Sequence, residues 1–134
     1  MLLKLIKIEC MPNTNRNKGH RAERLYANEF KSLGYDKCIT SRYGSRVHDD
    51  CGIDLLNVPV NVQIKAGKQR GINYSSVLSN IRERLLELFT MDSKEFEYPS
   101  IVIHRKDVGK GNKRDEYDDL VIMSWNDYKQ LIEK

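Results

Sequence analysis

Cysteine is scarce in this chain, and its spacing argues against two kinds of small domain. The three cysteines, Cys10, Cys38 and Cys51, are widely separated, odd in number and form no C-x-x-C pair. A secreted disulfide framework needs paired cysteines, and the common zinc motifs need closely spaced ones. We therefore expect reduced thiols in a cytoplasmic protein.

Long apolar runs are also missing. Residues 1–8 (MLLKLIKI) are hydrophobic, but two lysines interrupt them and Glu9 follows. This segment is too short to span a bilayer and lacks the h-region of a signal peptide. We expect residues 1–15 to form an edge strand or a packing arm, and we expect no membrane partner. The sequence has no repeat and no low-complexity tract.

What the chain does contain is an ordinary soluble composition with a small excess of positive charge. Of its 134 residues, 40% are hydrophobic and 31% are charged. This length suits one domain with a substantial core, so residues 1–134 are treated as a single domain. The 23 basic and 19 acidic residues give a net charge of +4, which is a mild bias toward polyanionic partners.

Hydrophobic periodicity predicts an α/β protein in which helices cover a small mixed sheet. The predicted helices cover residues 19–33 and 75–89, and a last helix ends at 132. The predicted strands cover residues 35–40, 53–56, 60–66, 100–104 and 119–123. Ser124 has the character of a helix cap. We expect the apolar side chains of the last helix to pack in the core; these are Trp125, Tyr128, Leu131 and Ile132.

Residues 51–67 (CGIDLLNVPVNVQIKAG) read as two short strands joined by a tight turn at 57–59. Alternation in the second strand places Gln63 and Lys65 on one face, and the turn brings Asp54 roughly opposite residue 62 or 63. A half-solvated hairpin would show the same alternation. However, an acid within an apolar strand is unfavourable for β-structure. A carboxylate and an amide beside a cation could hold Mg²⁺ against a phosphate.

Several other polar residues have two readings. Glu23 could pair with arginines of its own helix, or it could lean toward Asp54 as a second carboxylate. The segment 41–46 (SRYGSR) could wrap a phosphate or form a solvated turn. The basic, glycine-containing loop 105–114 could follow a nucleic-acid backbone, or it could be a solvated hairpin loop.

Taken together, these residues resemble the PD-(D/E)XK nuclease superfamily. The resemblance rests on Asp54 followed by Gln63-Ile64-Lys65, with Glu23 on an upstream helix, and it covers residues 16–104; residues 105–134 are an appended loop, strand and helix. Within the superfamily, the segments 18–24 (KGHRAER) and 41–46 look like those of archaeal and phage Holliday junction resolvases. Two departures exist: Gly52-Ile53 stands where the motif has proline, and Gln63 replaces the commoner glutamate, as in Mrr-type restriction endonucleases.

The resemblance implies a restriction-endonuclease-like core (αβββαβ) and a metal-dependent, structure-selective DNA endonuclease, working as a homodimer on branched DNA. It suits a prokaryotic or viral source. Mg²⁺, or Mn²⁺ in its place, would be held by Asp54, Gln63, the Ile64 carbonyl and Glu23. Lys65 would orient the attacking water, and Ser45 would bind a phosphate or a metal-bound water. The expected DNA contacts are Arg16, Lys18, Arg21, Arg42, Arg46, Lys68 and Arg70.

Three alternatives stay open at this point. The first is a restriction- or repair-type endonuclease of the same fold that acts on duplex DNA, or a nuclease that acts on RNA. The second is a nucleic-acid-binding module of this fold that has lost catalysis, with Gln63 as the sign of that loss. The third is a structural interaction domain with no nucleic-acid partner. Fold and motif alone do not separate these alternatives.

Overall fold

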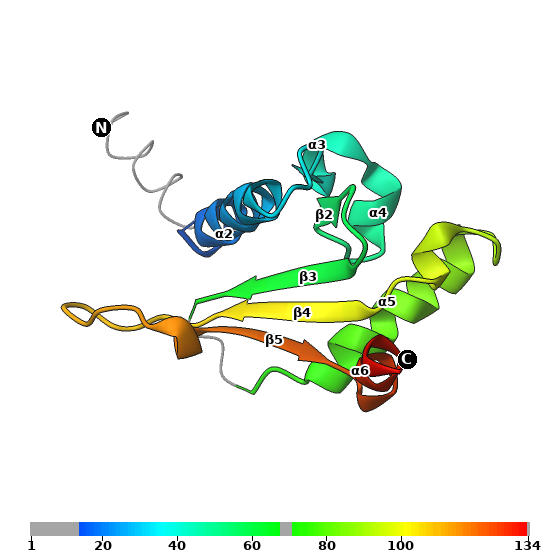
Figure 1. The fold of residues 1–134 in the computed structure, drawn as a ribbon. Helices are drawn as coiled ribbons and strands as arrows, with labels where there is room; N and C mark the ends of the chain where they lie inside the picture. The colour runs from blue at the N-terminus through cyan, green and yellow to red at the C-terminus, as the bar shows by residue number, and fades with distance from the viewer. Residues whose placement is uncertain (1–13, 68–70, 134) are drawn as a thin grey trace.

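The computed structural model describes residues 14–67 and 71–133, and Figure 1 shows a mixed α/β arrangement. The predicted arm at 1–15 lies outside the described residues, apart from positions 14 and 15. The elements in chain order are α2 (Thr14–Ser32), β1 (Ile39–Thr40), α3 (Ser41–Gly44), α4 (Arg46–Asp50), β2 (Leu55–Leu56), β3 (Asn61–Ala66), α5 (Tyr74–Leu88), the 3-10 turn η2 (Lys94–Phe96), β4 (Ser100–Arg105), the 3-10 turn η3 (Glu116–Asp118), β5 (Asp119–Met123) and α6 (Trp125–Ile132).

Two sheets organise these elements. The larger has the order β3-β4-β5, with β3 parallel to β4 and β4 antiparallel to β5. The smaller is an antiparallel pair of β1 and β2. The prediction of a small mixed sheet flanked by helices is therefore confirmed. None of the described helices is both long and apolar enough to cross a lipid bilayer.

The two faces of the larger sheet follow from alternation along β3. Val62 and Ile64 are buried in one cluster with Ala22 and Tyr26 of α2. Neighbouring residues on a strand point to opposite faces, so Gln63 and Lys65 face away from α2. Helix α5 packs against β4 on that second side, and its Ile81 is fully buried. The predicted alternation is thus confirmed.

The predicted hairpin at 53–66 is only partly correct. The turn exists, since Asn57 has a positive φ of 65°. However, β2 pairs with β1, with Leu56 opposite Ile39, instead of forming a continuous ladder with β3. The strand predicted at 35–40 shortens to Ile39–Thr40, because residues 35–38 form a turn in which Cys38 N donates to the Tyr35 carbonyl (3.0 Å).

The last helix corrects a prediction about the core. Trp125 is 68% exposed and Leu131 is 61% exposed, and Tyr128 and Ile132 are exposed as well. Helix α6 is capped by Ser124 as predicted, and Asp127 in its first turn accepts a hydrogen bond from Ser100 N (3.2 Å). This polar attachment turns the helix so that most of its apolar side chains face outward.

Candidate active site

Asp54 is fixed by hydrogen bonds to two neighbouring segments. Its backbone N–H donates to the Val62 carbonyl (2.8 Å), and its backbone carbonyl accepts from Ser41 N (2.8 Å). Its carboxylate atom Oδ2 accepts from Ile64 N (2.7 Å). The predicted acid therefore lies against the backbone of the Gln63-Ile64-Lys65 segment, as the sequence predicts.

The environment of Asp54 favours its neutral form. The pKa of this carboxyl is raised from 3.8 to about 7, chiefly by burial; the negative charges of Glu23 and Asp49 add to the rise, and the Ile64 N–H bond and the Lys65 charge oppose it. Two negative groups thus act on one partly buried acid. A cation placed here would relieve that repulsion.

The Ile64 carbonyl lies on the same edge of β3 as Asp54. In a strand, the N–H and C=O of one residue point to the same edge. Since Ile64 N donates to Asp54, its carbonyl also points away from β4 and toward this edge. The edge therefore presents a backbone oxygen beside a carboxylate.

Gln63 is held close to the loop that leads into Asp54. A Cβ built on Gly52 would lie 3.2 Å from the Gln63 atom Oε1, and Gly52 has a φ of +80°. The absence of a side chain at 52 therefore leaves room for the amide of Gln63. Lys65 follows on the same face, and its positive charge opposes the rise in the pKa of Asp54.

Glu23 makes an ion pair that neither sequence reading anticipated. Arg42 of α3 donates through Nη2 to Glu23 Oε1 (3.0 Å) and through Nε to Oε2 (3.3 Å). Glu23 is only 8% exposed. The partner of the Glu23 carboxylate is therefore an arginine of another helix and not one of its own helix. The role of Glu23 as a metal ligand stays a prediction.

The segment 41–46 is neither an open phosphate loop nor a solvated turn, because it forms α3 and the start of α4. Ser45 caps α4, accepting from His48 N (3.3 Å), and its hydroxyl also contacts His48 Nδ1 (2.7 Å). His48 Nε2 in turn lies 3.1 Å from Glu95 Oε1. The Ser45 hydroxyl is thus engaged within the protein, which argues against its predicted role. The i, i+3 spacing of Ser45 and His48 is the signal that could have revealed the cap.

A further contact beside Lys65 gave no signal in the sequence. His104 of β4 is the cross-strand partner of Lys65, so both side chains lie on the α5 face. The Tyr74 hydroxyl, at the start of α5, lies 2.5 Å from His104 Nδ1. Burial lowers the pKa of His104, and the positive charge of Lys106 lowers it as well. A hydrogen bond with the backbone of Gly67 opposes this shift. A largely neutral histidine therefore joins α5 to the strand beside Lys65.

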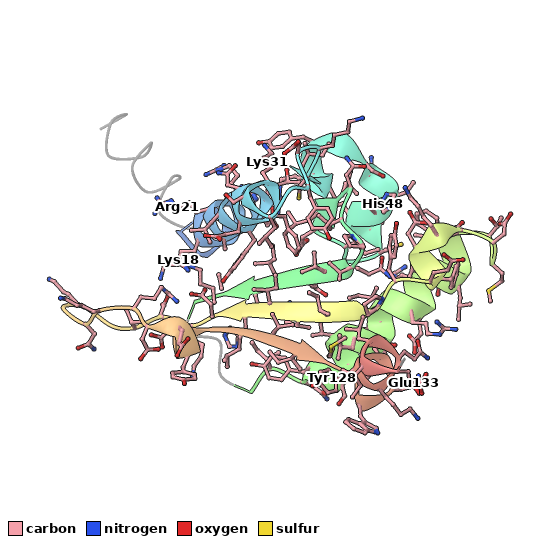
Figure 2. All side chains as sticks on the ribbon, in the orientation of Figure 1. Lys18, Arg21, Lys31, His48, Tyr128 and Glu133 are labelled. Carbon is pink, nitrogen blue, oxygen red and sulfur yellow. The ribbon has the colours of Figure 1, made fainter. Side chains whose placement is uncertain are left out.

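Among the described residues, the predicted DNA contacts lie on three helices, α2, α3 and α4. Lys18 and Arg21 lie near the start of α2, at the end that faces the carboxyl end of β3, while Lys31 lies toward the other end (Figure 2). Arg42 is held by Glu23, and Arg46 is exposed at the start of α4. The Arg16 side chain lies outside the described part of the structure, as do Lys68 and Arg70.

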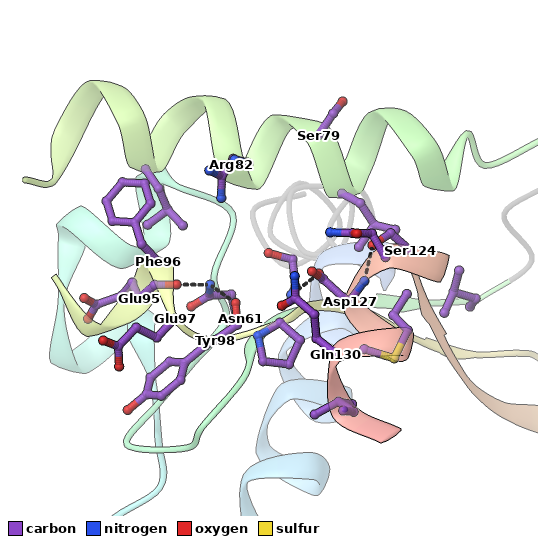
Figure 3. Close-up of a pocket in the computed structure, with 18 of the residues that line it drawn as sticks. Asn61, Ser79, Arg82, Glu95, Phe96, Glu97, Tyr98, Ser124, Asp127 and Gln130 are labelled. Atoms are coloured by element: carbon purple, nitrogen blue, oxygen red, sulfur yellow. Dashed lines mark hydrogen bonds between the residues drawn. The ribbon is translucent and has the colours of Figure 1, made fainter. Parts of the chain in front are cut away.

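A cavity of about 900 Å³ lies away from Asp54. It is bounded by α5, the segment 95–100 and α6 (Figure 3). Asn61 and Ser100 place it at the amino ends of β3 and β4, whereas Lys65 lies near the carboxyl end of β3. Asn61 Nδ2 donates to the Glu95 carbonyl (2.7 Å), so part of its polar lining is already engaged.

The Asp54 edge presents a carboxylate and a backbone carbonyl, which are the kinds of oxygen donor that a hard divalent cation takes. Among the described residues, no three acidic, histidine or cysteine side chains are close enough to share a metal ion. An ion here would therefore take one carboxylate oxygen from Asp54 and further oxygens from the Gln63 amide and the Ile64 carbonyl, a donor set that suits Mg²⁺.

Comparison of the chain with protein-family models, curated proteins and solved structures finds no match.

Proposed function

We propose that this protein is a metal-dependent DNA endonuclease with its active site at the Asp54 edge of β3. The observation that carries the proposal is the 2.7 Å bond from Ile64 N to the Asp54 carboxylate, which fixes the acid against the Gln63-Ile64-Lys65 segment. The order α2, β1, β2, β3, α5, β4 is compatible with a restriction-endonuclease-like core. In that case β1 and β2 form a ribbon beside the main sheet.

In the proposed mechanism, Asp54, Gln63 and the Ile64 carbonyl would hold Mg²⁺ or Mn²⁺, which would supply Lewis acidity to the scissile phosphate and to a water molecule. Lys65 would orient the attacking water and stabilise the additional negative charge that develops on the phosphate oxygens. The water oxygen would bond to phosphorus as the bond to the leaving sugar oxygen breaks. The attacking water would release a proton to solvent, and the leaving oxygen would take up a proton from solvent.

The proposed substrate is branched DNA, and the Holliday junction is the first candidate. This choice rests on the resemblance of the segments 18–24 and 41–46 to junction resolvases. Cleavage of four-way junctions, flaps and linear duplexes in Mg²⁺ separates the candidates. Equal cutting of linear duplex would favour the Mrr-type alternative, and binding without cleavage in either Mg²⁺ or Mn²⁺ would favour the inactive module.

Replacing Lys65 tests the proposal directly. Lys65→Ala is expected to lower the rate of junction cleavage by about 10²–10³-fold, the usual effect of removing one group that stabilises transition-state charge. Junction affinity should fall by no more than about fivefold, the effect expected when one phosphate contact among several is lost. The measurement is single-turnover cleavage with binding followed in parallel.

Lys37→Ala is the matched control, because Lys37 is exposed in the turn before β1. Its cleavage rate should equal that of the wild type. Wild-type rates for Lys65→Ala would contradict the mechanism.

We also propose that a second copy of the chain covers β5 and α6. Strand β5 ends the sheet and has no further neighbour among the described residues. Its sequence, DLVIM, contains no lysine or proline of the kind that protects an exposed edge. Together with Val121, which is 62% exposed, the outward side chains of α6 present on the order of 500 Å² of apolar surface.

An antiparallel β5–β5 contact about a two-fold axis would bury this surface and approach the ~800 Å² per partner of a stable interface. Replacing Trp125 and Leu131 together with serine should convert a dimer to a monomer in sedimentation velocity. Tyr43→Ser is the control, because Tyr43 is 81% exposed but lies on α3. A monomeric wild type would reject the proposed dimer.

A further inference from the structure

A second charged feature lies where the start of α2 meets the carboxyl ends of β3 and β4. It is a hollow of about 300 Å³ between these elements and the loop that follows β4. Four basic side chains line it, and they define what we call the basic hollow: Lys18, Arg21, Arg105 and Arg114. Ala22, Leu25 and Ala66 contribute an apolar floor.

Two of the three arginines that line the hollow, Arg105 and Arg114, are held in place by hydrogen bonds. Arg105 Nη1 donates to Asp119 Oδ1 (2.9 Å), and Arg114 Nη1 lies 3.4 Å from Asp119 Oδ2. Arg114 Nη2 also donates to the Lys106 carbonyl (2.5 Å), which closes the base of the loop. The Tyr26 hydroxyl of α2 donates to the same Asp119 carboxylate. Because one acid anchors both arginines, binding an anion here requires little reorganisation.

The charges of the hollow do not balance. Four cations face two carboxylates, Asp107 in the lining and Asp119 behind it, so two positive charges are in excess. Lys18 Nζ lies 3.4 Å from Asp107 in a largely solvent-exposed pair, which an incoming anion can replace. Arg21 is exposed and makes no ion pair with the described residues. The basic hollow is therefore suited to an anionic group.

The distance from the hollow to the Asp54 edge can be estimated along two elements. Ala66 lies two residues beyond Ile64, which is about 7 Å along a strand. Lys18 lies five residues before Glu23, which is about 7.5 Å along a helix. One strand of DNA rises about 3.4 Å per nucleotide along the helix axis, and its successive phosphates lie roughly 6–7 Å apart through space. Both estimates therefore correspond to about one to two nucleotides.

We infer that the basic hollow binds a backbone phosphate of the DNA strand that is cut, about one to two nucleotides from the phosphate at Asp54. Arg21 and Arg114 contact the phosphate oxygens, and the apolar floor packs against the adjoining sugar. The inference rests on the proposed function for the position of the cut, but phosphate binding in the hollow does not depend on catalysis. It adds to the active site a fixed path for the strand along the first half of α2.

A scan with neutral linkages tests the inference. One strand of a synthetic four-way junction carries a single methylphosphonate at successive positions, and binding is measured by fluorescence anisotropy without metal. For the wild type, a methylphosphonate at one position should weaken binding by about fivefold, because one phosphate contact is lost. For Arg21→Gln, a methylphosphonate at that position should weaken binding no further. The slope of log affinity against log salt should also fall by about 1 in this variant.

Lys31→Gln is the matched control, because Lys31 lies toward the opposite end of α2 and outside the hollow. It should keep the wild-type slope and the wild-type interference pattern. An unchanged slope in Arg21→Gln, or no DNA binding at all by the wild type, would overturn phosphate binding in the hollow.

Mapping the cut separates this inference from the nuclease proposal. With Mg²⁺ present, the sensitive linkage should lie about one to two nucleotides from the cleaved bond. If one methylphosphonate weakens binding but the protein never cleaves DNA, phosphate binding in the hollow is supported and the nuclease proposal is rejected. A cut more than about four nucleotides from the sensitive linkage would reject the proposed strand path.

Discussion

Asp54→Asn is expected to abolish metal-dependent cleavage and, at the same time, to make the metal-free protein more stable at pH 8. Loss of the only side-chain carboxylate in the proposed metal site should lower the cleavage rate by about 10³-fold or more. The asparagine Oδ1 can still accept the hydrogen bond from Ile64 N, so the fold around position 54 should be retained. The two effects have opposite signs and are measured independently.

The stability effect follows from the raised pKa of Asp54. A rise from 3.8 to about 7 corresponds to about 4 kcal/mol between the two protonation states, taken as an upper value. Because the folded protein binds this proton more tightly than the unfolded chain, this contribution to stability is present below pH 4 and is lost as the pH rises to 7. Asparagine does not ionise. The variant should therefore match the wild type near pH 4 and exceed it by about 2–4 kcal/mol above pH 7.

Chemical denaturation of both proteins between pH 4 and 8 measures this difference. Asp36→Asn is the control, because Asp36 is exposed in the turn before β1, and its difference from the wild type should not vary in this way. A pH-independent difference for Asp54→Asn would show that the acid is not held in its neutral form. Retained cleavage would show that it is not the metal ligand.

Removing Arg42 should have the second large effect. Arg42→Gln leaves the buried Glu23 carboxylate without its partner, beside an acid that already resists ionisation. Loss of one member of a buried pair costs about 3–5 kcal/mol, and the 33% exposure of the Arg42 side chain reduces that to about 2 kcal/mol. The double variant with Glu23→Gln should recover part of this loss, since the unpaired charge is gone. Urea denaturation at pH 7 measures all three variants.

Arg24→Gln is the matched control for this series, because Arg24 is exposed on the same helix as Glu23. It should change the free energy of unfolding by less than about 0.5 kcal/mol. If Arg42→Gln behaves like Arg24→Gln, the Glu23–Arg42 pair contributes nothing to the fold. If the double variant is no more stable than Arg42→Gln, the buried charge is not the cause of the loss.

Local patterns predicted much of this structure. The alternation of β3, the strand at 119–123 and the cap at Ser124 all depend on residues close in sequence, and the structure has each of them. The helix predicted at 75–89 is α5, displaced by one residue at each end. Asp54 lies beside the backbone of Ile64 because a short turn joins their segments.

What the sequence did not predict depends on contacts between distant segments. Periodicity shows that α6 has an apolar side but not which partner that side meets, so Trp125 was placed in a core that does not cover it. Arg42 and Glu23 are 19 positions apart, and nothing in either local segment indicates that they pair. Likewise, β2 could have paired with β3 along its length. That it pairs with β1 instead depends on contacts between segments that are distant in the sequence.

The most direct test of the proposed active site is the position of a bound Mn²⁺ ion in crystals of the wild-type protein. Anomalous scattering from Mn²⁺ should give a peak at the edge of β3, within coordination distance of the Asp54 carboxylate and the Ile64 carbonyl, and Asp54→Asn crystals should lack it. A peak elsewhere, or an equal peak in the variant, would contradict a metal site built on Asp54.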